Sequence, residues 1–247
     1  MQNAGVKTLL IATRNNHKVG EIRTLLGGGY RYLTLRVFPD APEVVEDRDT
    51  FAGNAAKKAE ELASWLRGER ERTRQHLADP AARLGRGQEA PETQSGATLE
   101  TAGLLVVADD SGLEVDALDG APGVFSARYA ALESGGEGNS PDGENNARLL
   151  RELAGVSPEN RSARFRCVIA VVEVDRLEEG AFVFDGACEG RIQDQANGDG
   201  GFGYDPLFVP EGFEESFAEL GEETKNQLSH RARALEKLKP WLDAQPG

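Results

Sequence analysis

The chain has 247 residues with a hydrophobic content of 39%, which suits one medium-sized domain with a buried core. Lys and Arg total 28 against 42 Asp and Glu, and a formal net charge of −14 argues against nucleic acid and anionic membranes as partners. The two cysteines, Cys167 and Cys188, lie in apolar segments and are expected to be buried free thiols. Because residues 9–12 form too short an apolar run for a signal peptide, we expect a cytoplasmic protein.

The first elements read as a strand, a polar loop and a helix. Residues 6–12 are apolar, the loop begins at Thr13, and a helical apolar pattern runs from Lys18 to the glycines at 27–29. This order brings Lys18 and backbone N–H groups together, which suits an anion. The alternative is an ordinary turn in which Thr13 or Asn15 caps the helix. The glycine-rich pattern of a P-loop is absent.

A second strand is expected at residues 33–38, followed by an acidic loop at 39–49 and a helix that begins at Thr50 or Asn54. Lys57 lies about one turn into this helix, where it either points back toward a site at the helix start or is simply solvated. Residues 67–101 are rich in charge, glycine, proline and glutamine with almost no apolar periodicity. They are predicted to form a partly flexible insertion.

At the centre of the chain, an apolar run at residues 104–108 stops at Asp109 and Asp110. This pattern predicts a buried strand that ends by presenting two carboxylates, with a second strand-like piece at 113–118. Adjacent carboxylates are costly without a cation, and a divalent metal is one answer. A turn capped by the two side chains is the other, and this stretch alone leaves both open.

The second half of the chain is expected to hold a helix at 144–153 and an antiparallel pair of strands at 163–174 and 181–189. A glycine-rich stretch at 198–206 contains Phe202 and Tyr204, which suits either a flat ligand such as a nucleobase or a tight turn with two core aromatics. A basic helix is predicted from about Lys225 to Leu242, with Ser229 as a possible cap.

Several motifs occur in order along most of the chain: Thr13-x-Asn15-x-x-Lys18; Thr50-Phe51-x-Gly53-Asn54-Ala55 with Lys57; Ala108-Asp109-Asp110-Ser111-Gly112-Leu113; Pro122-Gly123-x-x-Ser126-Ala127-Arg128-Tyr129; Gly201-Phe202-Gly203-Tyr204-Asp205-Pro206; and Lys225-x-x-x-Ser229-His230-Arg231. Together they resemble the inosine triphosphate pyrophosphatase family from about residue 6 to 238. The resemblance implies an elongated, two-lobed α/β fold over residues 1–247. A long twisted mixed sheet would span it, with the active cleft between the lobes, and a homodimer is expected.

The resemblance also implies a reaction. This is the Mg²⁺-dependent hydrolysis of ITP, dITP and XTP to the monophosphate and pyrophosphate, which removes deaminated purines from the nucleotide pool. Asp110 would be the proton acceptor and, with Glu46, a magnesium ligand, although Asp47 or Asp49 are alternatives to Glu46. The expected substrate-binding residues are Thr13, Arg14, Asn15, Asn16, His17, Lys18, Lys57, Ser111, Arg128, Phe202, Gly203, Tyr204, Asp205, Lys225, His230 and Arg231.

Elementary chemistry agrees with these roles. Hydrolysis of a phosphoanhydride depends mostly on positioning and charge stabilisation, which a carboxylate base and nearby cations supply. Arg231 or a backbone N–H is a candidate donor to the 6-oxo group of the purine. Arg14 stands where the family usually has glycine, so it either adds a phosphate contact or alters the loop. The rival functions are house-cleaning of another modified nucleotide and non-catalytic nucleotide binding.

Overall fold

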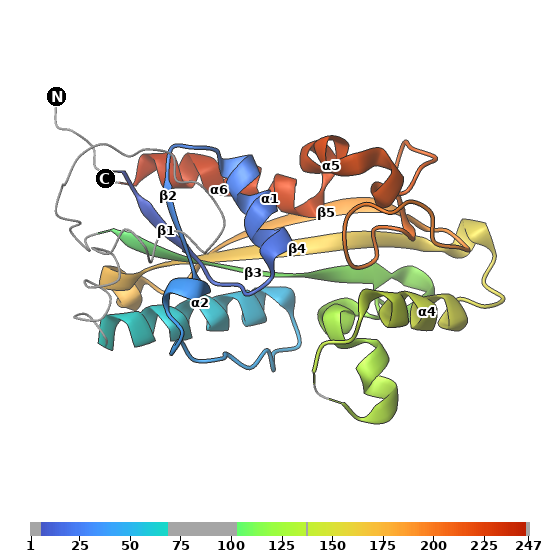
Figure 1. Ribbon diagram of the computed structural model, residues 1–247, viewed down its shortest axis with the longest axis horizontal. Coiled ribbons are helices and arrows are strands. Elements are labelled where there is room, and N and C mark those ends of the chain that lie inside the picture. The colour runs from blue at the N-terminus through green and yellow to red at the C-terminus, as the bar shows by residue number, and fades with distance from the viewer. Residues whose placement is uncertain (1–5, 69–102, 137, 246–247) are drawn as a thin grey trace.

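A six-stranded mixed sheet of order β2-β1-β3-β4-β5-β6 organises the molecule (Figure 1). β1 pairs in parallel with both β2 and β3, and the remaining pairs are antiparallel. Three long strands, β3 to β5, run along most of the molecule and give it an elongated shape (Figure 1). The strands are β1 (Thr8–Ile11), β2 (Arg31–Thr34), β3 (Leu104–Val115), β4 (Ser162–Glu173), β5 (Phe182–Ile192) and β6 (Phe208–Pro210).

The computed structural model describes residues 6–68, 103–136 and 138–245, so nearly all of the predicted insertion at 67–101 lies outside the described residues. No helix in these three stretches is long and apolar enough to cross a membrane. The α-helices are α1 (Asn16–Leu26), α2 (Phe51–Gly68), α4 (Asp142–Glu152), α5 (Phe217–Leu228) and α6 (His230–Ala244).

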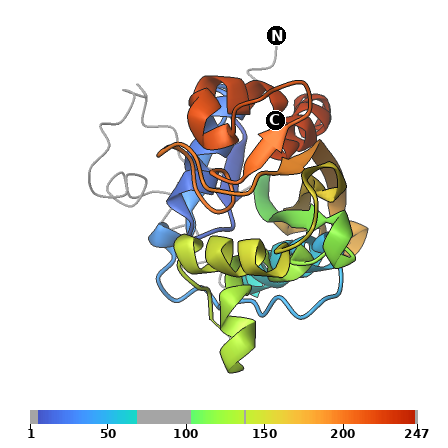
Figure 2. The same ribbon diagram turned by 90° about the vertical axis from the view of Figure 1, so that its right-hand side faces the viewer.

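Three apolar clusters divide the molecule into two lobes along the sheet. In the first lobe, α2 packs on one face of the sheet, and α1 and α6 cover the other (Figure 1). In the second lobe, α4 and α5 enclose the far ends of β3 to β5, and a third cluster gathers their aromatic side chains (Figure 2). The nearly continuous burial of β3 and of the second half of β4 follows from this two-sided cover. The predicted α/β class with a long mixed sheet over two lobes is confirmed.

The central strand does not end at its carboxylates, contrary to the sequence prediction. β3 continues without a break to Val115, and Asp109 and Asp110 pair in the middle of it with Ile169 and Val168 of β4. What ends there is the neighbouring strand. β1 stops at Ile11, opposite Val107, and its place beside β3 is taken by the polar loop that leads into α1. The carboxylates therefore lie where the sheet loses one strand.

Other elements differ from the prediction in extent. β2 is only four residues long and is followed by a 3₁₀ turn (Leu35–Val37), so the strand predicted at 33–38 is too long. The single basic helix predicted from Lys225 is two helices. Ser229 interrupts them, and its hydroxyl accepts the backbone N–H of Ala232 at 3.2 Å as the predicted cap of α6. The antiparallel pair of β4 and β5 and the two buried free cysteines are confirmed.

The packing of α6 on β5 tolerates no side chain at Gly186. A Cβ built there would lie 2.1 Å from the backbone oxygen of His230 and 2.5 Å from the backbone nitrogen of Ala234. We predict that Gly186→Ala lowers the free energy of unfolding by about 1–3 kcal/mol or more, because two backbone segments must separate. Gly20→Ala is the control, since nothing lies within 4 Å of a Cβ built at Gly20 in α1. Its free energy of unfolding should rise by about 0.5–1 kcal/mol, because alanine favours a helix more than glycine does. Chemical denaturation measures both variants. A Gly186→Ala variant with the same free energy of unfolding as the wild type would contradict this packing.

Candidate active site

Asp109 and Asp110 are neighbours on a β-strand, so their side chains face opposite sides of the sheet. Val107 lies on the same side as Asp109, in the cluster under α1 and α6, whereas Ala108 lies with Asp110 on the side covered by α2. The exposed fractions are 2% for Asp109 and 5% for Asp110. The two carboxylates are thus almost equally buried, but they lie on opposite faces of the sheet among different neighbours.

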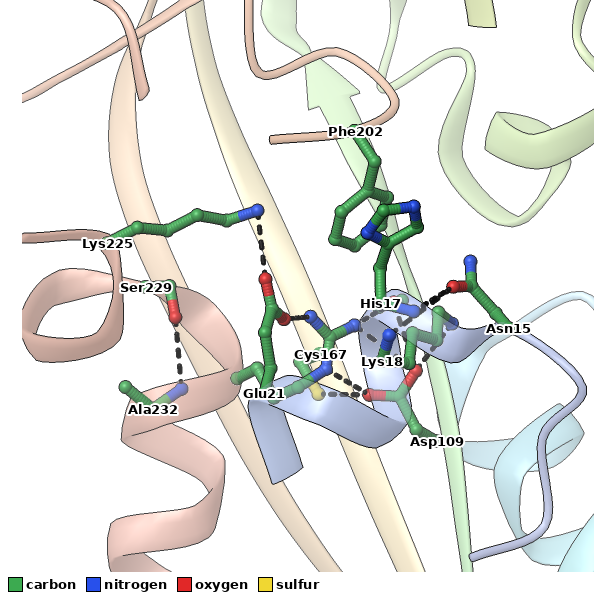
Figure 3. Close-up of polar contacts among 12 residues, drawn as sticks. Asn15, His17, Lys18, Glu21, Asp109, Cys167, Phe202, Lys225, Ser229 and Ala232 are labelled. Carbon is green, nitrogen blue, oxygen red and sulfur yellow. Dashed lines mark hydrogen bonds and ion pairs between the residues drawn. The ribbon is translucent and has the colours of Figure 1, made fainter. Parts of the chain in front are cut away.

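Asp109 is neutralised by cations from two helices. Its carboxylate accepts from Lys18 Nζ of α1 at 2.5 Å and from Arg231 Nε of α6 at 3.0 Å (Figure 3). Ser111 and the thiol of Cys167 donate to it as well, at 3.2 and 3.0 Å. Burial raises the pKa of Asp109, but Arg231 and Lys18 more than offset it and hold that pKa well below the ordinary value. Asp109 is therefore ionised and fully bonded.

Asp110 lacks such partners. Within the described stretches its Oδ2 is buried without a hydrogen bond, and the buried Nδ2 of Asn54 in α2 is unpaired too. Burial raises the pKa of Asp110 to about 6, and the negative charge of Glu46 adds to the rise, while Lys18, Lys58 and the nearby side-chain amide of Asn54 act against it. A carboxylate with a free oxygen and a pKa near neutrality is suited to accept a proton or to bind a cation.

Lys58, rather than the predicted Lys57, is the helix α2 cation at this site. Lys58 Nζ forms an ion pair with Glu46 and lies 3.4 Å from the backbone oxygen of Asp109. Lys57 points to the loop before the helix, where it contacts Asp47 and the backbone oxygen of Val45 at 2.8 Å each. The reason is helical geometry, because consecutive residues differ by about 100° around the axis. In the acidic loop, the negative charge of Glu46 raises the pKa of Asp110, whereas Asp47 is paired with Lys57.

The loop after β1 is built around the Asn15 cap. The Asn15 side chain accepts the backbone N–H groups of His17 at 2.9 Å and of Lys18 at 3.3 Å, and the hydroxyl of Thr13 accepts the N–H of Asn15 at 3.2 Å. Arg14 is exposed and does not have a positive φ, so replacing the family's glycine causes no backbone strain here.

Asn16 turns away from the carboxylates. Its side-chain oxygen accepts a hydrogen bond from Arg36 at 2.6 Å. Within this loop and the first turn of α1, Lys18 reaches Asp109 and His17 reaches Phe202, whereas the Asn16 side chain is bound to Arg36.

A chain of ion pairs links Asp109 to the glycine-rich stretch. Arg231 also pairs with Glu21 of α1, and Glu21 pairs with Lys225 Nζ of α5 at 3.0 Å (Figure 3). Lys225 in turn pairs with the buried Asp205 at 2.6 Å. The nitrogen of Lys225 lies 4.3 Å from the centroid of the Phe202 ring, and the Asp205 carboxylate accepts the Phe202 N–H at 2.8 Å. The predicted Phe202, Asp205, Lys225 and Arg231 are thus connected.

The remaining predicted residues lie around this chain. Gly203 is held by α4, because its N–H donates to Asp142 at 2.6 Å and its carbonyl accepts from Asn146 at 3.1 Å. Tyr204 is buried, and its hydroxyl donates to the Ser126 carbonyl at 2.9 Å. Arg128 donates to the backbone oxygen of Glu46 at 3.1 Å, which places it on the Asp110 side.

His230, which the resemblance implies as a substrate-binding residue, is a buried side chain. It is buried against the ring of Phe165, with centroids 4.8 Å apart and planes at 14°, and its Nδ1 has no hydrogen bond in the described residues. Burial, with help from Arg231 and Lys225, lowers its pKa well below the ordinary value, so the ring is neutral.

Arg231 is fully buried, and its guanidinium donates to Asp109, Glu21 and Ser111. The contact proposed between Arg231 and a purine 6-oxo group stays a prediction. Sequence reasoning missed Glu21 and Lys58. Both had a helical signal, since Glu21 follows Lys18 by one turn and Lys58 follows Asn54 by one turn.

Comparison with known proteins finds a match to the Ham1 family over residues 9–81 and 87–241. A dITP/XTP pyrophosphatase of Shouchella clausii is 42% identical over 235 residues, which cover 95% of this chain and 96% of the relative. One of Desulforamulus reducens is 43% identical over 236 residues, 95% of each. Among solved structures, a HAM1 protein from Coxiella burnetii superposes with a TM-score of 0.72 at 32% identity, covering 97% of this chain and all of the other.

The two central aspartates should have opposite effects on stability. The folded-state pKa of Asp110 is raised from 3.8 to about 6, so its ionised form opposes folding above pH 6 and has no such effect below about pH 4. We predict that Asp110→Asn raises the free energy of unfolding at pH 8 by about 3 kcal/mol, a gain that disappears as the pH falls to 4.

Asp109→Asn is the matched control for that variant. Its free energy of unfolding at pH 8 should be about 3–5 kcal/mol lower than that of the wild type, since the substitution leaves buried Lys18 and Arg231 without their shared partner. Urea denaturation at several pH values, in buffer with a metal chelator, measures both. An Asp110→Asn variant less stable than the wild type at pH 8 would contradict the description of this site.

Proposed function

This chain belongs to the Ham1 family, and on that premise we propose that it hydrolyses deaminated purine nucleoside triphosphates, namely ITP, dITP and XTP, to the monophosphate and pyrophosphate. Such a hydrolase of phosphoanhydride bonds would clear these nucleotides from the cellular pool. The names of the curated relatives support dITP and XTP as substrates. The homodimer and the cytoplasmic location implied by the resemblance remain predictions.

The observation that carries this proposal is the unequal state of the two aspartates. Asp109 holds Lys18 and Arg231 in place, whereas Asp110 keeps a buried oxygen without a partner and a pKa raised to about 6. At neutral pH, Asp110 is mostly ionised and its pKa is close to the working pH, which is the condition for an effective general base. A purely structural carboxylate would be paired, as Asp109 is.

The unpaired Oδ2 of Asp110 also bears on whether the residues of this site suit Mg²⁺. Within the described residues no group of three or more His, Cys, Asp or Glu forms a cage for a metal. Mg²⁺ in phosphate-transfer sites usually takes one or two carboxylates together with substrate phosphates and water, so a smaller donor set fits it. Asp110 and Glu46 would hold the ion on the α2 side of the sheet. When bound, Mg²⁺ supplies charge neutralisation to the phosphates and orients water.

The chain's own residues supply the rest of the reaction. Asp110 accepts a proton from the attacking water, and the leaving pyrophosphate carries the displaced electron pair. Lys18, at the start of α1, and Lys58, on α2, lie on either side of Asp110 and stabilise charge that develops on the phosphates. The N-terminus of α1 also favours an anion. Ser111, between Asp109 and Arg231, is in reach of the same space.

The substrate class is tested with a panel of triphosphates, with and without Mg²⁺. We expect ITP, dITP and XTP to have values of kcat/KM about 10² above that of ATP, since an oxo group and an amine at position 6 need opposite hydrogen-bonding partners. They should also exceed dTTP and UTP, because a pyrimidine is a smaller ring system than a purine and leaves part of the base pocket unfilled. The products should be the monophosphate and pyrophosphate, as measured by chromatography, and a chelator should abolish turnover. If ITP and XTP react no faster than dTTP or UTP, the proposed specificity is wrong.

Asp110→Asn separates catalysis from binding. We expect kcat for ITP to fall by about 10²–10⁴, the usual contribution of a general base, while the protein stays folded and still binds the nucleotide. Steady-state kinetics and equilibrium binding of ITP measure the two effects. Turnover close to that of the wild type would remove Asp110 from the mechanism and favour the reading of a structural aspartate.

Lys58 and Lys57 form a matched pair of neighbouring lysines on α2. Lys58→Ala should lower kcat/KM by about 10²–10³, because Lys58 lies between Glu46 and the Asp109 backbone beside the reacting group. Lys57→Ala should stay within a few-fold of the wild type, because Lys57 contacts the exposed loop at Val45 and Asp47. Equal losses in the two variants would mean that the site extends over both lysines.

A further inference from the structure

The imidazole of His17 lies against the phenyl ring of Phe202, a contact that the proposed hydrolysis does not use. The ring centroids are 5.3 Å apart and the planes are inclined by 19°, which is a stacked arrangement (Figure 3). His17 belongs to the first turn of α1, next to Lys18, and Phe202 belongs to the glycine-rich stretch. The contact joins the loop assigned to the triphosphate to the segment assigned to the base.

The two rings are held very differently. Phe202 is fixed from its backbone, because its N–H donates to the buried carboxylate of Asp205, which is itself bound by Lys225. His17 is exposed and fixed only through its backbone N–H, which donates to the Asn15 side chain at 2.9 Å. In the described stretches the imidazole has no hydrogen bond or ion pair that would stop it from turning away. Phe202 is thus anchored to a buried ion pair through its backbone, whereas the His17 side chain has no comparable restraint.

The spacing of the two rings decides whether a purine base could lie between them or would have to displace His17. A separation of 5.3 Å is that of one stacked pair, so a purine base does not fit between the rings. A base that stacks on this face of Phe202 must first displace the imidazole. A purine is the larger ring system and covers more of the phenyl face, and its sugar and phosphates are held elsewhere in the site.

We propose that the His17 imidazole competes with the purine base for the face of Phe202, so that His17 sets the affinity of the site for the base. The proposal rests on the proposed function, because it takes the substrate to be a purine nucleotide. The apparent affinity for the nucleotide is the intrinsic affinity multiplied by the fraction of time for which the face is uncovered. A ligand without a base is not subject to this competition, so His17 affects selection for the base and not for the phosphate.

Direct binding of inosine monophosphate and of ribose 5-phosphate, which lacks the base, tests the competition without any turnover. By calorimetry, His17→Ala should bind inosine monophosphate about 2- to 10-fold more tightly than the wild type, since the competitor is gone. Its affinity for ribose 5-phosphate should not rise with it, because that ligand has no base to compete with the imidazole. In a Phe202→Leu background, where the stacking face is lost, His17→Ala should have no further effect, which a double-mutant cycle measures.

Nuclear magnetic resonance of the imidazole gives a second readout on the wild-type protein. The His17 ring protons, assigned by their loss in His17→Ala, should be displaced from ordinary positions by the Phe202 ring. They should return toward those positions on addition of inosine monophosphate and not of ribose 5-phosphate. Equal or weaker binding of inosine monophosphate by His17→Ala, or His17 resonances that stay unmoved, would overturn the proposal. A protein that binds inosine monophosphate in this way but hydrolyses no purine triphosphate would disprove only the proposed function.

Discussion

The burial of two adjacent carboxylates in one strand is the constraint on which the rest of the site depends. A buried charge is tolerated only when it is paired or bonded, and the pleat of β3 sends Asp109 and Asp110 to opposite faces of the sheet. The protein satisfies one fully, with Lys18 and Arg231, and leaves the other with a free oxygen. Asp109 therefore supports Lys18 and Arg231, and Asp110 is left available for the chemistry that we propose.

The sheet topology makes that arrangement possible. Because β1 ends opposite Val107, the loop into α1 lies beside the carboxylates and brings Lys18 to them from the first lobe. Glu21 and Lys225 then continue the chain of ion pairs toward Phe202 in the second lobe. The cations of this network are paired with carboxylates, so its charge is locally balanced although the chain as a whole is acidic.

Local patterns in the sequence predicted much of this, and the failures have physical causes. Asn15 as a cap, Ser229 as a cap, and the antiparallel β4 and β5 follow from short-range rules and were predicted. The end of the strand at Asp109 was predicted wrongly, because acidic residues usually end a strand, and the pairing with β4 that overrides this preference is long-range. The contact of Lys58, and not Lys57, with Glu46 and the burial of His230 against Phe165 could not be read from the sequence for the same reason, since side-chain contacts and burial depend on packing against distant elements.

The central claim, that the two aspartates carry different charge states because of their surroundings, is tested most directly by titrating their side-chain carboxyl carbons by carbon-13 magnetic resonance in metal-free buffer. Asn variants at each position assign the two signals. The account predicts that Asp110 titrates near pH 6 while Asp109 stays ionised throughout the range in which the protein is folded. Two ordinary titrations near pH 4, or a raised pKa at Asp109 in place of Asp110, would contradict it.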